Sequence, residues 1–456
     1  MAKSTVQYVC SSCGAKAPQM LGRCPVCGEW GTYEAEYLSD GTGKTASAKR
    51  GLPGAAGQPK RLQDVEATEE MRLDMRNGEF NRVLGGGLVP GSLVLLGGEP
   101  GIGKSTLALQ VLMQMGERKT FYASGEESVR QLKLRAERLA GNAENLYISS
   151  ETSLERILEQ VKELEPEIVV VDSIQTIGTE AIDATIGSIS QVRECAARIM
   201  EFAKTRNIPF IIIGHINKEG SLAGPKVLEH IVDTVLQFEG DQQYMYRILR
   251  AQKNRFGSTS ELGIYEMRQD GLREVTNPSE LLLSTAREGL SGVAIAAAVE
   301  GVRPFLIEVQ ALVSSAAYGT PQRSSTGFDG RRLNMLLAVL EKRVGFKLLQ
   351  KDVFINIAGG LRVQDTAIDL AIMAAVLSSN MDIALDASTC LCGEVGLAGE
   401  IRAVNRIEQR IAEAQKLGFK RIMIPAGQKV DTSRFKIEVV PVKRVTDAFR
   451  LLIKSN

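Results

Sequence analysis

The sequence predicts an α/β fold built around a mainly parallel sheet, and two features of the chain predict it. Residues 98–106 read Gly-Glu-Pro-Gly-Ile-Gly-Lys-Ser-Thr, which fits the Gly-x-x-x-x-Gly-Lys-Ser phosphate loop at every fixed position. Between about residues 62 and 275, short apolar runs alternate with amphipathic segments, a pattern typical of parallel strands joined by helices that cover both faces. The phosphate loop lies between the apolar run 93–96 and the helix-forming residues 107–115, which is the strand–loop–helix context it requires.

Composition allows a multidomain protein and excludes few functions. A length of 456 residues with 44% apolar residues permits two or three domains with separate cores. The formal net charge of +1 neither favours nor excludes nucleic acid binding, since basic residues can gather on one surface. We find no run of eighteen apolar residues and no charged-then-apolar leader, so we expect a cytoplasmic protein that does not enter a membrane.

The phosphate loop predicts a nucleotide triphosphatase. Gly98, Gly101 and Gly103 let successive N–H groups point at phosphate oxygens, and the positive end of the following helix strengthens the anion site. Lys104 can reach the β- and γ-phosphates, and the Ser105 hydroxyl can ligate Mg²⁺. The flanking strand and helix disfavour the alternative, a glycine-rich turn without a ligand. The predicted nucleotide-binding residues are Gly98, Glu99, Pro100, Gly101, Ile102, Gly103, Lys104, Ser105 and Thr106.

Polar residues at predicted strand ends complete the expected site. The predicted strands are 93–96, 120–123, 146–148, 168–171 and 210–213. The fourth ends at Asp172, which we predict to hold Mg²⁺ through water. Glu126 and then Glu127 are our choices for the carboxylate that deprotonates the attacking water, the alternative being charges favoured by a helix N-terminus. His215 ends the fifth strand, where it either senses the γ-phosphate or is an ordinary hydrogen-bonded histidine.

Four cysteines near the N-terminus predict a structural zinc site. Cys10 and Cys13 form one C-x-x-C pair, and Cys24 and Cys27 form a second, ten residues later. Two such pairs supply four thiolates for a closed tetrahedral Zn²⁺ site, and metal binding would stabilise a segment with too few apolar residues for its own core. A redox dithiol or paired disulfides are the alternatives.

Basic residues gather in two further places. Residues 38–61 carry five Lys or Arg against Asp40 alone and read as a flexible cationic linker, with nucleic acid binding as the alternative role. Arg247, Arg250, Lys253 and Arg255 lie within nine residues. In an oligomer, cations at a strand end can reach the γ-phosphate that a neighbouring subunit binds.

These residues resemble one family. The four-cysteine N-terminus, the phosphate loop, the pentapeptide Lys-Asn-Arg-Phe-Gly at 253–257 and the C-terminal third resemble the bacterial RadA (Sms) family of DNA repair proteins, over essentially the whole chain. The resemblance implies a RecA-like ATPase core in a hexameric ring that binds single-stranded DNA and branched recombination intermediates and promotes branch migration or unwinding. In that reading Lys253 and Arg255 couple neighbouring subunits, the cofactors are ATP, Mg²⁺ and Zn²⁺, and a recombinase is a further partner.

The C-terminal segment is predicted to be a separate α/β domain that resembles the proteolytic domain of Lon proteases. We expect strands at 293–299, 305–309 and 353–357, a helix at 365–379, strands at 391–395 and 399–404, and a helix at 406–417. Lon-type hydrolysis needs a serine activated by a lysine, but Ala367 and Glu408 align with these positions. We therefore expect a scaffold without protease activity. Three arginines of this domain are candidate DNA contacts, with a solvated helix face as the alternative: Arg331, Arg332 and Arg343.

The predicted organisation is a zinc ribbon (1–37), a flexible linker (38–61), a RecA-like ATPase core (62–277) and a Lon-protease-like domain (278–456). The first function we expect is a DNA-dependent ATPase motor in recombinational repair. Two alternatives stay open at this point: an ATP-dependent protease, and a regulatory ATP-binding protein that recruits a recombinase or helicase.

Overall fold

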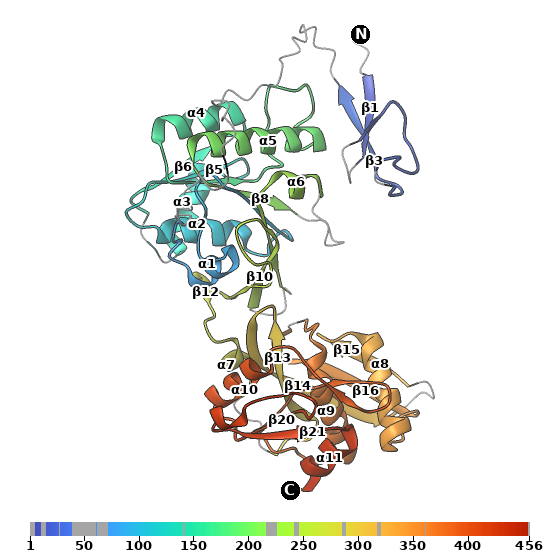
Figure 1. Cartoon of the computed structure of the whole chain (residues 1–456). Helices are drawn as coiled ribbons and strands as arrows, with labels where there is room; N and C mark the ends of the chain where they lie inside the picture. Colours follow the sequence, from blue (N-terminus) through green and yellow to red (C-terminus); the bar gives the residue numbers. More distant parts are fainter. Residues whose placement is uncertain are drawn as a thin grey trace. The chain divides into compact units, whose positions relative to one another are not determined.

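The computed structural model describes residues 5–10, 15–26, 28–38, 61, 72–139, 141, 143–215, 226–240, 246–284, 289–316, 321–360 and 362–454. The chain divides into two compact units, Met1–Val275 and Thr276–Asn456 (Figure 1). The first unit contains the cysteine-rich segment and the phosphate loop, and the second contains the C-terminal α/β domain. No helix in the described part of the chain is long and apolar enough to cross a membrane.

The N-terminal segment forms a small antiparallel sheet in the order β2-β1-β3. Its strands are β1 (Thr5–Cys10), β2 (Lys16–Ala17) and β3 (Tyr33–Leu38). The buried side chains that pack together here are Cys10, Ala17, Cys24 and Tyr33. A core of this size does not stabilise a domain by itself, so the segment needs a further source of folding free energy.

The phosphate loop belongs to a sheet that has nine strands within the described residues, in the order β12-β11-β10-β9-β4-β8-β7-β5-β6. Its strands are β4 (Leu93–Gly98), β5 (Thr120–Ser124), β6 (Leu146–Ser150), β7 (Ile168–Asp172), β8 (Phe210–His215), β9 (Thr234–Glu239), β10 (Tyr246–Asn254), β11 (Leu262–Arg268) and β12 (Gly271–Glu274). Strands β4 to β9 pair in parallel, whereas β9 to β12 form an antiparallel edge. The five predicted strands are confirmed, and each extends one or two residues further at its carboxyl end.

Helices cover both faces of this sheet (Figure 1). The helices are α1 (Gly78–Leu84), α2 (Lys104–Gln114), α3 (Val129–Arg138), α4 (Leu154–Leu164), α5 (Ile189–Arg206) and α6 (Lys226–Ile231). Because successive strand residues point to opposite faces, Val94 and Leu96 pack with α1, α2 and α3. Leu93 and Leu95 pack with α4, α5 and α6 on the other face. The carboxyl ends of β4, β5, β7 and β8 therefore meet at one edge, above two filled apolar layers.

The second unit is built on a mixed sheet of seven strands, counted over its described residues, in the order β15-β16-β14-β13-β17-β20-β21. Its strands are β13 (Val293–Glu300), β14 (Arg303–Ser315), β15 (Arg323–Thr326), β16 (Lys351–Ile357), β17 (Thr389–Leu391), β20 (Arg421–Pro425) and β21 (Glu438–Val442). Its helices are α7 (Pro278–Leu282), α8 (Gly330–Val339), α9 (Asp369–Met381), α10 (Ile407–Lys416) and α11 (Val445–Lys454). Helix α9 is buried along most of its length, as expected of a helix that is apolar on all sides.

The prediction of one strand at 391–395 is wrong. Strand β17 ends at Leu391, and β18 (Glu394–Val395) pairs with β19 (Ile401–Arg402) in a separate two-stranded sheet. At the intervening Gly393, a Cβ atom would lie 2.6 Å from Cγ2 of Ile401, so the turn depends on glycine. The strand expected at 399–404 is likewise reduced to the two residues of β19.

Candidate active site

The phosphate loop joins β4 to α2 at the carboxyl edge of the parallel strands. A Cβ atom on Gly98 would lie 2.6 Å from the carbonyl oxygen of Phe238, and one on Gly103 would lie 2.7 Å from the methyl carbon of Met267. Gly101 and Gly103 have φ angles of +78° and +112°, which side chains disfavour. Close packing and backbone conformation therefore both require glycine here. Of the remaining loop residues, Glu99 and Pro100 are exposed, Ile102 is buried, and Ser105 and Thr106 are half-buried in the first turn of α2.

Lys104 folds back over its own loop. Its ammonium nitrogen donates to the carbonyl oxygens of Gly98 and Glu99 at 2.8 and 2.9 Å, and it lies 3.2 Å from Nδ1 of His215. Burial lowers the pKa of Lys104 to about 8, although the nearby carboxylates of Asp172 and Glu126 favour the charged form and partly oppose this shift. The cation is thus held where phosphate oxygens can replace its carbonyl partners.

Glu126 follows β5 two residues after its last residue, Ser124, and contacts the same histidine as Lys104. Its Oε1 accepts a hydrogen bond from the Ser173 hydroxyl at 2.6 Å and lies 3.1 Å from Nε2 of His215. Burial by itself raises the pKa of Glu126, but the hydrogen bonds from Ser173 and His215 and the charge of Lys104 hold it below its ordinary value. The side chain is therefore a carboxylate at neutral pH, ready to accept a proton.

Glu127, the second choice from the sequence, has a different environment. Its carboxylate forms a close ion pair with Arg135 of α3. An arginine partner stabilises the charged carboxylate and holds it against the helix. Because Glu127 is paired with Arg135, Glu126 is the stronger candidate base of the two.

Asp172 ends β7 beside the loop and is 4% exposed. Its Oδ2 accepts a hydrogen bond of 2.5 Å from the hydroxyl of Tyr122, whose pKa burial and the Asp172 charge raise well above the usual range. Its Oδ1 is buried and has no hydrogen-bond partner among the described residues. A buried, unpaired carboxylate oxygen is costly unless a water or cation binds it, so the residues present fit Mg²⁺ held by Asp172 and Ser105.

The sequence did not single out Tyr122 or Ser173. Tyr122 reads as one more apolar strand residue, and nothing in its local pattern reveals an aspartate partner 50 residues away. Ser173 directly follows Asp172, and this position is the only feature of the sequence that points to a role for Ser173 in the site. The structure adds both residues to the site.

Lys253 and Arg255 lie away from the phosphate loop of the same chain. Strand β10 runs antiparallel to β9, and Lys253 pairs with Val235 of β9. The residue of β9 that pairs with Gly98 of the phosphate loop is Phe238, three positions further along the strand. Three residues of a strand span about 10 Å, so Lys253 and Gly98 are separated by about this distance along the strand direction. Within the chain, the two cations therefore face the opposite edge from the nucleotide loop.

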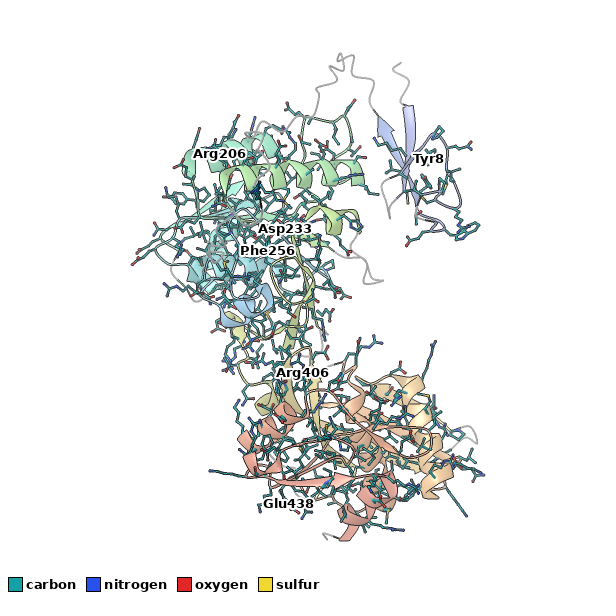
Figure 2. All side chains as sticks on the ribbon, viewed as in Figure 1. Tyr8, Arg206, Asp233, Phe256, Arg406 and Glu438 are labelled. Atoms are coloured by element: carbon teal, nitrogen blue, oxygen red, sulfur yellow. The ribbon has the colours of Figure 1, made fainter. Side chains whose placement is uncertain are left out.

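Both cations already have partners at that edge. The ammonium of Lys253 donates to the carbonyl oxygens of Glu229 and Val232 at 2.6 and 2.7 Å, and burial followed by the charge of Arg255 lowers its pKa. Arg255 pairs at 2.9 Å with the buried Asp233, labelled in Figure 2 close to Phe256. The other oxygen of Asp233 accepts from the backbone N–H of Leu93, where β4 begins. The pentapeptide is thus connected to the strand that carries the phosphate loop.

Arg247 is the cation of this group that contacts the loop, because its Nε donates to the carbonyl of Ile102 at 3.3 Å. Next to it, residues 266–270 at the turn between β11 and β12 form an open surface. A Cβ atom on Gly103 would lie 2.7 Å from the methyl carbon of Met267 in this turn. The turn therefore lies beside the phosphate loop.

Of the four predicted zinc ligands, Cys10 and Cys24 lie within the described residues, and Cys13 and Cys27 lie outside them. Cys10 and Cys24 are buried in the same small core although 14 positions separate them in the sequence. The N–H of Cys24 bonds to the carbonyl of Glu29, and the N–H of Gly28 bonds to the carbonyl of Cys24. The small core therefore contains one cysteine of each C-x-x-C pair, an arrangement that fits a metal ion shared by the two pairs.

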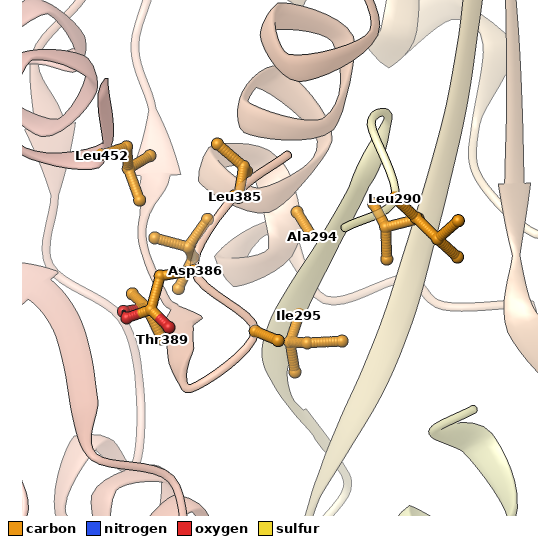
Figure 3. A pocket seen from close by; sticks show the side chains of 10 residues that line it. Leu290, Ala294, Ile295, Leu385, Asp386, Thr389 and Leu452 are labelled. Carbon is orange, nitrogen blue, oxygen red and sulfur yellow. Dashed lines mark hydrogen bonds between the residues drawn. The ribbon is translucent and has the colours of Figure 1, made fainter. Parts of the chain in front are cut away.

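The pocket of the second unit drawn in Figure 3 is too small for a substrate. It lies between Ile295, Leu385, Asp386 and neighbouring side chains and has a volume of about 10 Å³, close to the room of one water molecule. A larger, more open pocket of about 450 Å³ borders α8 and includes Arg332. Ala367, at the serine position, is fully buried in the core beneath α10. Glu408, at the lysine position, is exposed and pairs with Arg434 at 3.4 Å.

The three arginines proposed as DNA contacts are not equivalent. Arg331 and Arg343 are exposed. Arg332 forms a close ion pair with Asp369, which is fully buried at the start of α9. The assignment of Arg332 as a DNA contact or a solvated residue is therefore wrong, because its charge compensates a buried carboxylate.

Three family models match parts of the chain. A rubredoxin metal binding domain matches residues 8–34, an AAA domain matches residues 58–221, and the model described as subunit ChlI of Mg-chelatase matches residues 328–428. Together with the sheet topology, these matches confirm the predicted fold class: a zinc ribbon, a phosphate-loop ATPase core and a ChlI/Lon-like α/β domain.

Whole-length relatives also match. A protein of Bacillus subtilis named DNA repair protein RadA is 50% identical over 453 residues, covering 99% of both chains. A protein of the same name from Listeria monocytogenes is 47% identical and covers 98% of both chains. Among solved structures, a KaiC-like protein from Pyrococcus horikoshii aligns with 45% of this chain and 99% of its own, at 20% identity and a TM-score of 0.38.

Proposed function

The chain belongs to the RadA family of DNA repair proteins, and from this membership we propose that it is a DNA-dependent ATPase that acts on recombination intermediates. The observation that carries the proposal is the chain of contacts from Lys104 through His215 to Glu126, beside the unpaired oxygen of Asp172. This arrangement combines a phosphate-binding cation, a candidate base and a candidate metal ligand at one sheet edge, as phosphoryl transfer to water requires.

The chain's own residues supply most of the hydrolytic mechanism that we propose. The loop amides and Lys104 bind the β- and γ-phosphates. Glu126 accepts a proton from the attacking water while the water oxygen forms a bond to the γ-phosphorus. The bond between the γ-phosphorus and the β–γ bridging oxygen breaks, and ADP leaves with its electron pair. His215 and Ser173 hold the Glu126 carboxylate in place. Mg²⁺ held by Ser105 and Asp172 would supply positive charge that neutralises the phosphates.

Coupling between subunits is the second part of the proposal. In a homo-hexameric ring, Lys253 and Arg255 of one subunit contact the γ-phosphate bound by the next, since within their own subunit they lie at the opposite sheet edge. Single-stranded DNA passes through the ring and is contacted mainly at its phosphates, so binding weakens as salt increases. The ring thereby promotes branch migration or unwinding of branched intermediates in the cytoplasm, together with a recombinase.

The remaining segments support this motor. Cys10, Cys13, Cys24 and Cys27 hold Zn²⁺ in the ribbon (1–37), and residues 38–61 connect it to the ATPase core (62–277). We assign the Lon-protease-like domain (278–456) to a scaffold without protease activity, because Ala367 replaces the nucleophile and is buried.

The proposal is tested by steady-state ATP hydrolysis with and without single-stranded DNA, on the native protein and on Lys104→Ala. We expect strong stimulation by DNA and its loss in the variant. Hydrolysis that ignores DNA would overturn the motor and favour a regulatory role, whereas peptide release from an unfolded protein substrate would favour a protease.

Contact between subunits is tested by mixing two inactive variants. Lys104→Ala keeps Lys253 but cannot bind phosphate properly, and Lys253→Ala keeps an intact phosphate loop. If Lys253 acts on the neighbouring subunit, mixed oligomers regain DNA-stimulated hydrolysis. If Lys253 acts only by holding α6 through Glu229 and Val232, mixing restores nothing. Gln252→Ala, on the same strand and exposed, is the matched control that retains activity.

A further inference from the structure

One exposed surface of the cysteine-rich ribbon has no role in the proposed motor. We call it the Trp30 platform, formed by Met20, Arg23, Val26 and Trp30. Trp30 is the only tryptophan of the chain and is 75% exposed, and Met20 and Val26 are 67% and 73% exposed. Three large apolar side chains exposed within eleven residues of one small module indicate a binding surface.

Backbone pairing holds the indole in place. Arg23 and Trp30 form an antiparallel bridge, and the N–H of Gly31 donates to the carbonyl of Gly22 at 2.8 Å. The Nε of Arg23 donates to the carbonyl of Gly28 at 2.9 Å, which leaves its guanidinium carbon 5.8 Å from the centre of the Trp30 ring. The ring and the cation are therefore positioned before any ligand binds, so binding orders few side chains.

The chemistry of the platform matches unpaired bases. A flat, exposed aromatic ring next to a guanidinium is the combination on which bases stack in single-stranded nucleic acid, with the cation close to the backbone phosphate. Lys16, on the neighbouring strand β2, is also exposed. Residues 38–61, which follow in the sequence, contain five Lys or Arg against one Asp, a composition that suits a polyanion.

We propose that the Trp30 platform is a separate DNA-binding site that stacks one or two unpaired bases of single-stranded DNA. The proposal rests on the proposed function, since it requires a protein that binds DNA. It adds a contact to bases outside the ATPase core. Such a site would hold a strand by a contact that does not depend on the nucleotide state of the phosphate loop.

The single tryptophan makes the test direct. In the full-length zinc-loaded protein, the emission of Trp30 is followed while oligo(dT) is added, and then an abasic deoxyribose oligomer with the same number of phosphates. Stacking predicts quenching by oligo(dT) and little change with the abasic oligomer. Binding of a labelled oligo(dT) is measured in parallel by fluorescence anisotropy.

Variants separate stacking from charge. Trp30→Ala should weaken oligo(dT) binding about 5- to 150-fold, since stacking contributes about 1–3 kcal/mol per base. Its salt dependence should stay unchanged because the ring neutralises no phosphate, and Trp30→Tyr should restore most of the affinity. Leu349→Ala, at a side chain that is 68% exposed in the second unit, is the control without effect. Zinc content confirms that each variant keeps the ribbon.

The possible outcomes distinguish this site from the proposed function. If labelled DNA binds equally well to Trp30→Ala and the native emission does not change, the platform is not a DNA site although the motor proposal stands. If no DNA binds under any condition, both proposals are wrong. If the emission changes with protein concentration alone, the platform is a contact between copies of the chain and the inference is overturned.

Discussion

The ammonium nitrogen of Lys104 lies 3.2 Å from Nδ1 of His215. The other ring nitrogen of His215 faces the carboxylate of Glu126 at 3.1 Å. One imidazole thus joins the phosphate-binding cation to the candidate base, so a phosphate that draws Lys104 away from its present partners also changes the contacts of His215. We expect nucleotide binding and water activation to be coupled through this residue.

The first prediction concerns the two neighbouring glutamates. Glu126→Gln removes the proton acceptor but keeps the hydrogen bond from Ser173, so hydrolysis should fall about 10²- to 10⁴-fold while nucleotide affinity changes little. Glu127→Gln is the matched control, because its carboxylate pairs with Arg135 and faces α3. Single-turnover hydrolysis and nucleotide binding measure the two effects. A larger loss of hydrolysis in Glu127→Gln would show that Glu127, and not Glu126, activates the water.

The second prediction concerns the connection itself. His215→Ala leaves Lys104 and Glu126 in the chain but removes the group that positions them relative to each other. We expect kcat to fall about 10- to 100-fold through misplacement of the carboxylate, with KM for ATP nearly constant. A rise in KM at unchanged kcat would mean that His215 only helps to bind nucleotide. His230, on α6, is the chain's other histidine, and His230→Ala is the control.

The third prediction tests the support of the metal ligand. Tyr122→Phe removes the hydrogen bond to Asp172 without changing the shape of the buried ring. Because residues that orient a metal ligand affect metal binding about 10- to 100-fold, the Mg²⁺ concentration for half-maximal hydrolysis should rise by a similar factor. Tyr147→Phe, on the exposed side of β6, should behave like the native protein. Equal Mg²⁺ dependence in both variants would contradict a role for Tyr122.

Local patterns in the sequence predicted much of this site. The phosphate loop has a fixed spacing, and apolar runs followed by polar residues placed Glu126, Asp172 and His215 at one edge, because the carboxyl ends of parallel strands meet. The sequence could not predict which of these groups touch. His215 lies 111 residues from Lys104 and 89 from Glu126, and such pairings depend on strand order rather than on local pattern.

The same limit explains the errors. The strand expected at 391–395 is interrupted at Gly393, where a Cβ atom would lie 2.6 Å from Cγ2 of Ile401, a contact that the local sequence does not reveal. The sequence shows the charge of Arg332 but not its partner, the buried Asp369, which lies 37 residues further along the chain.

The fourth prediction concerns thiols and zinc removal. Burial raises the pKa of Cys195 and Cys392 to about 12, and it raises that of Cys390 well above its ordinary value. A thiol with a pKa of about 12 is about 0.01% thiolate at pH 8, so these three cysteines should not react with a thiol reagent below strongly alkaline pH. Of the seven cysteines, the other four should react only after a chelator removes zinc.

The thiol count at pH 8 checks this directly. We expect no reactive thiols in the native protein, four after chelation, and seven in denaturant. More than four reactive thiols before denaturation would contradict the burial of Cys195, Cys390 and Cys392. Four reactive thiols without a chelator would contradict the zinc site.

The last prediction is that the second unit does not cleave peptides, even when the two dyad residues are restored. Ala367→Ser combined with Glu408→Lys would place a hydroxyl where Ala367 is now fully buried against the core beneath α10. Asp365, two residues before Ala367, is held by the buried Arg410 at 2.6 Å, which fixes this turn. Unfolded casein incubated with the variant and ATP should therefore release no peptides while hydrolysis of ATP continues. Peptide release by the double variant would show that the turn opens and that only two side chains separate this domain from a protease.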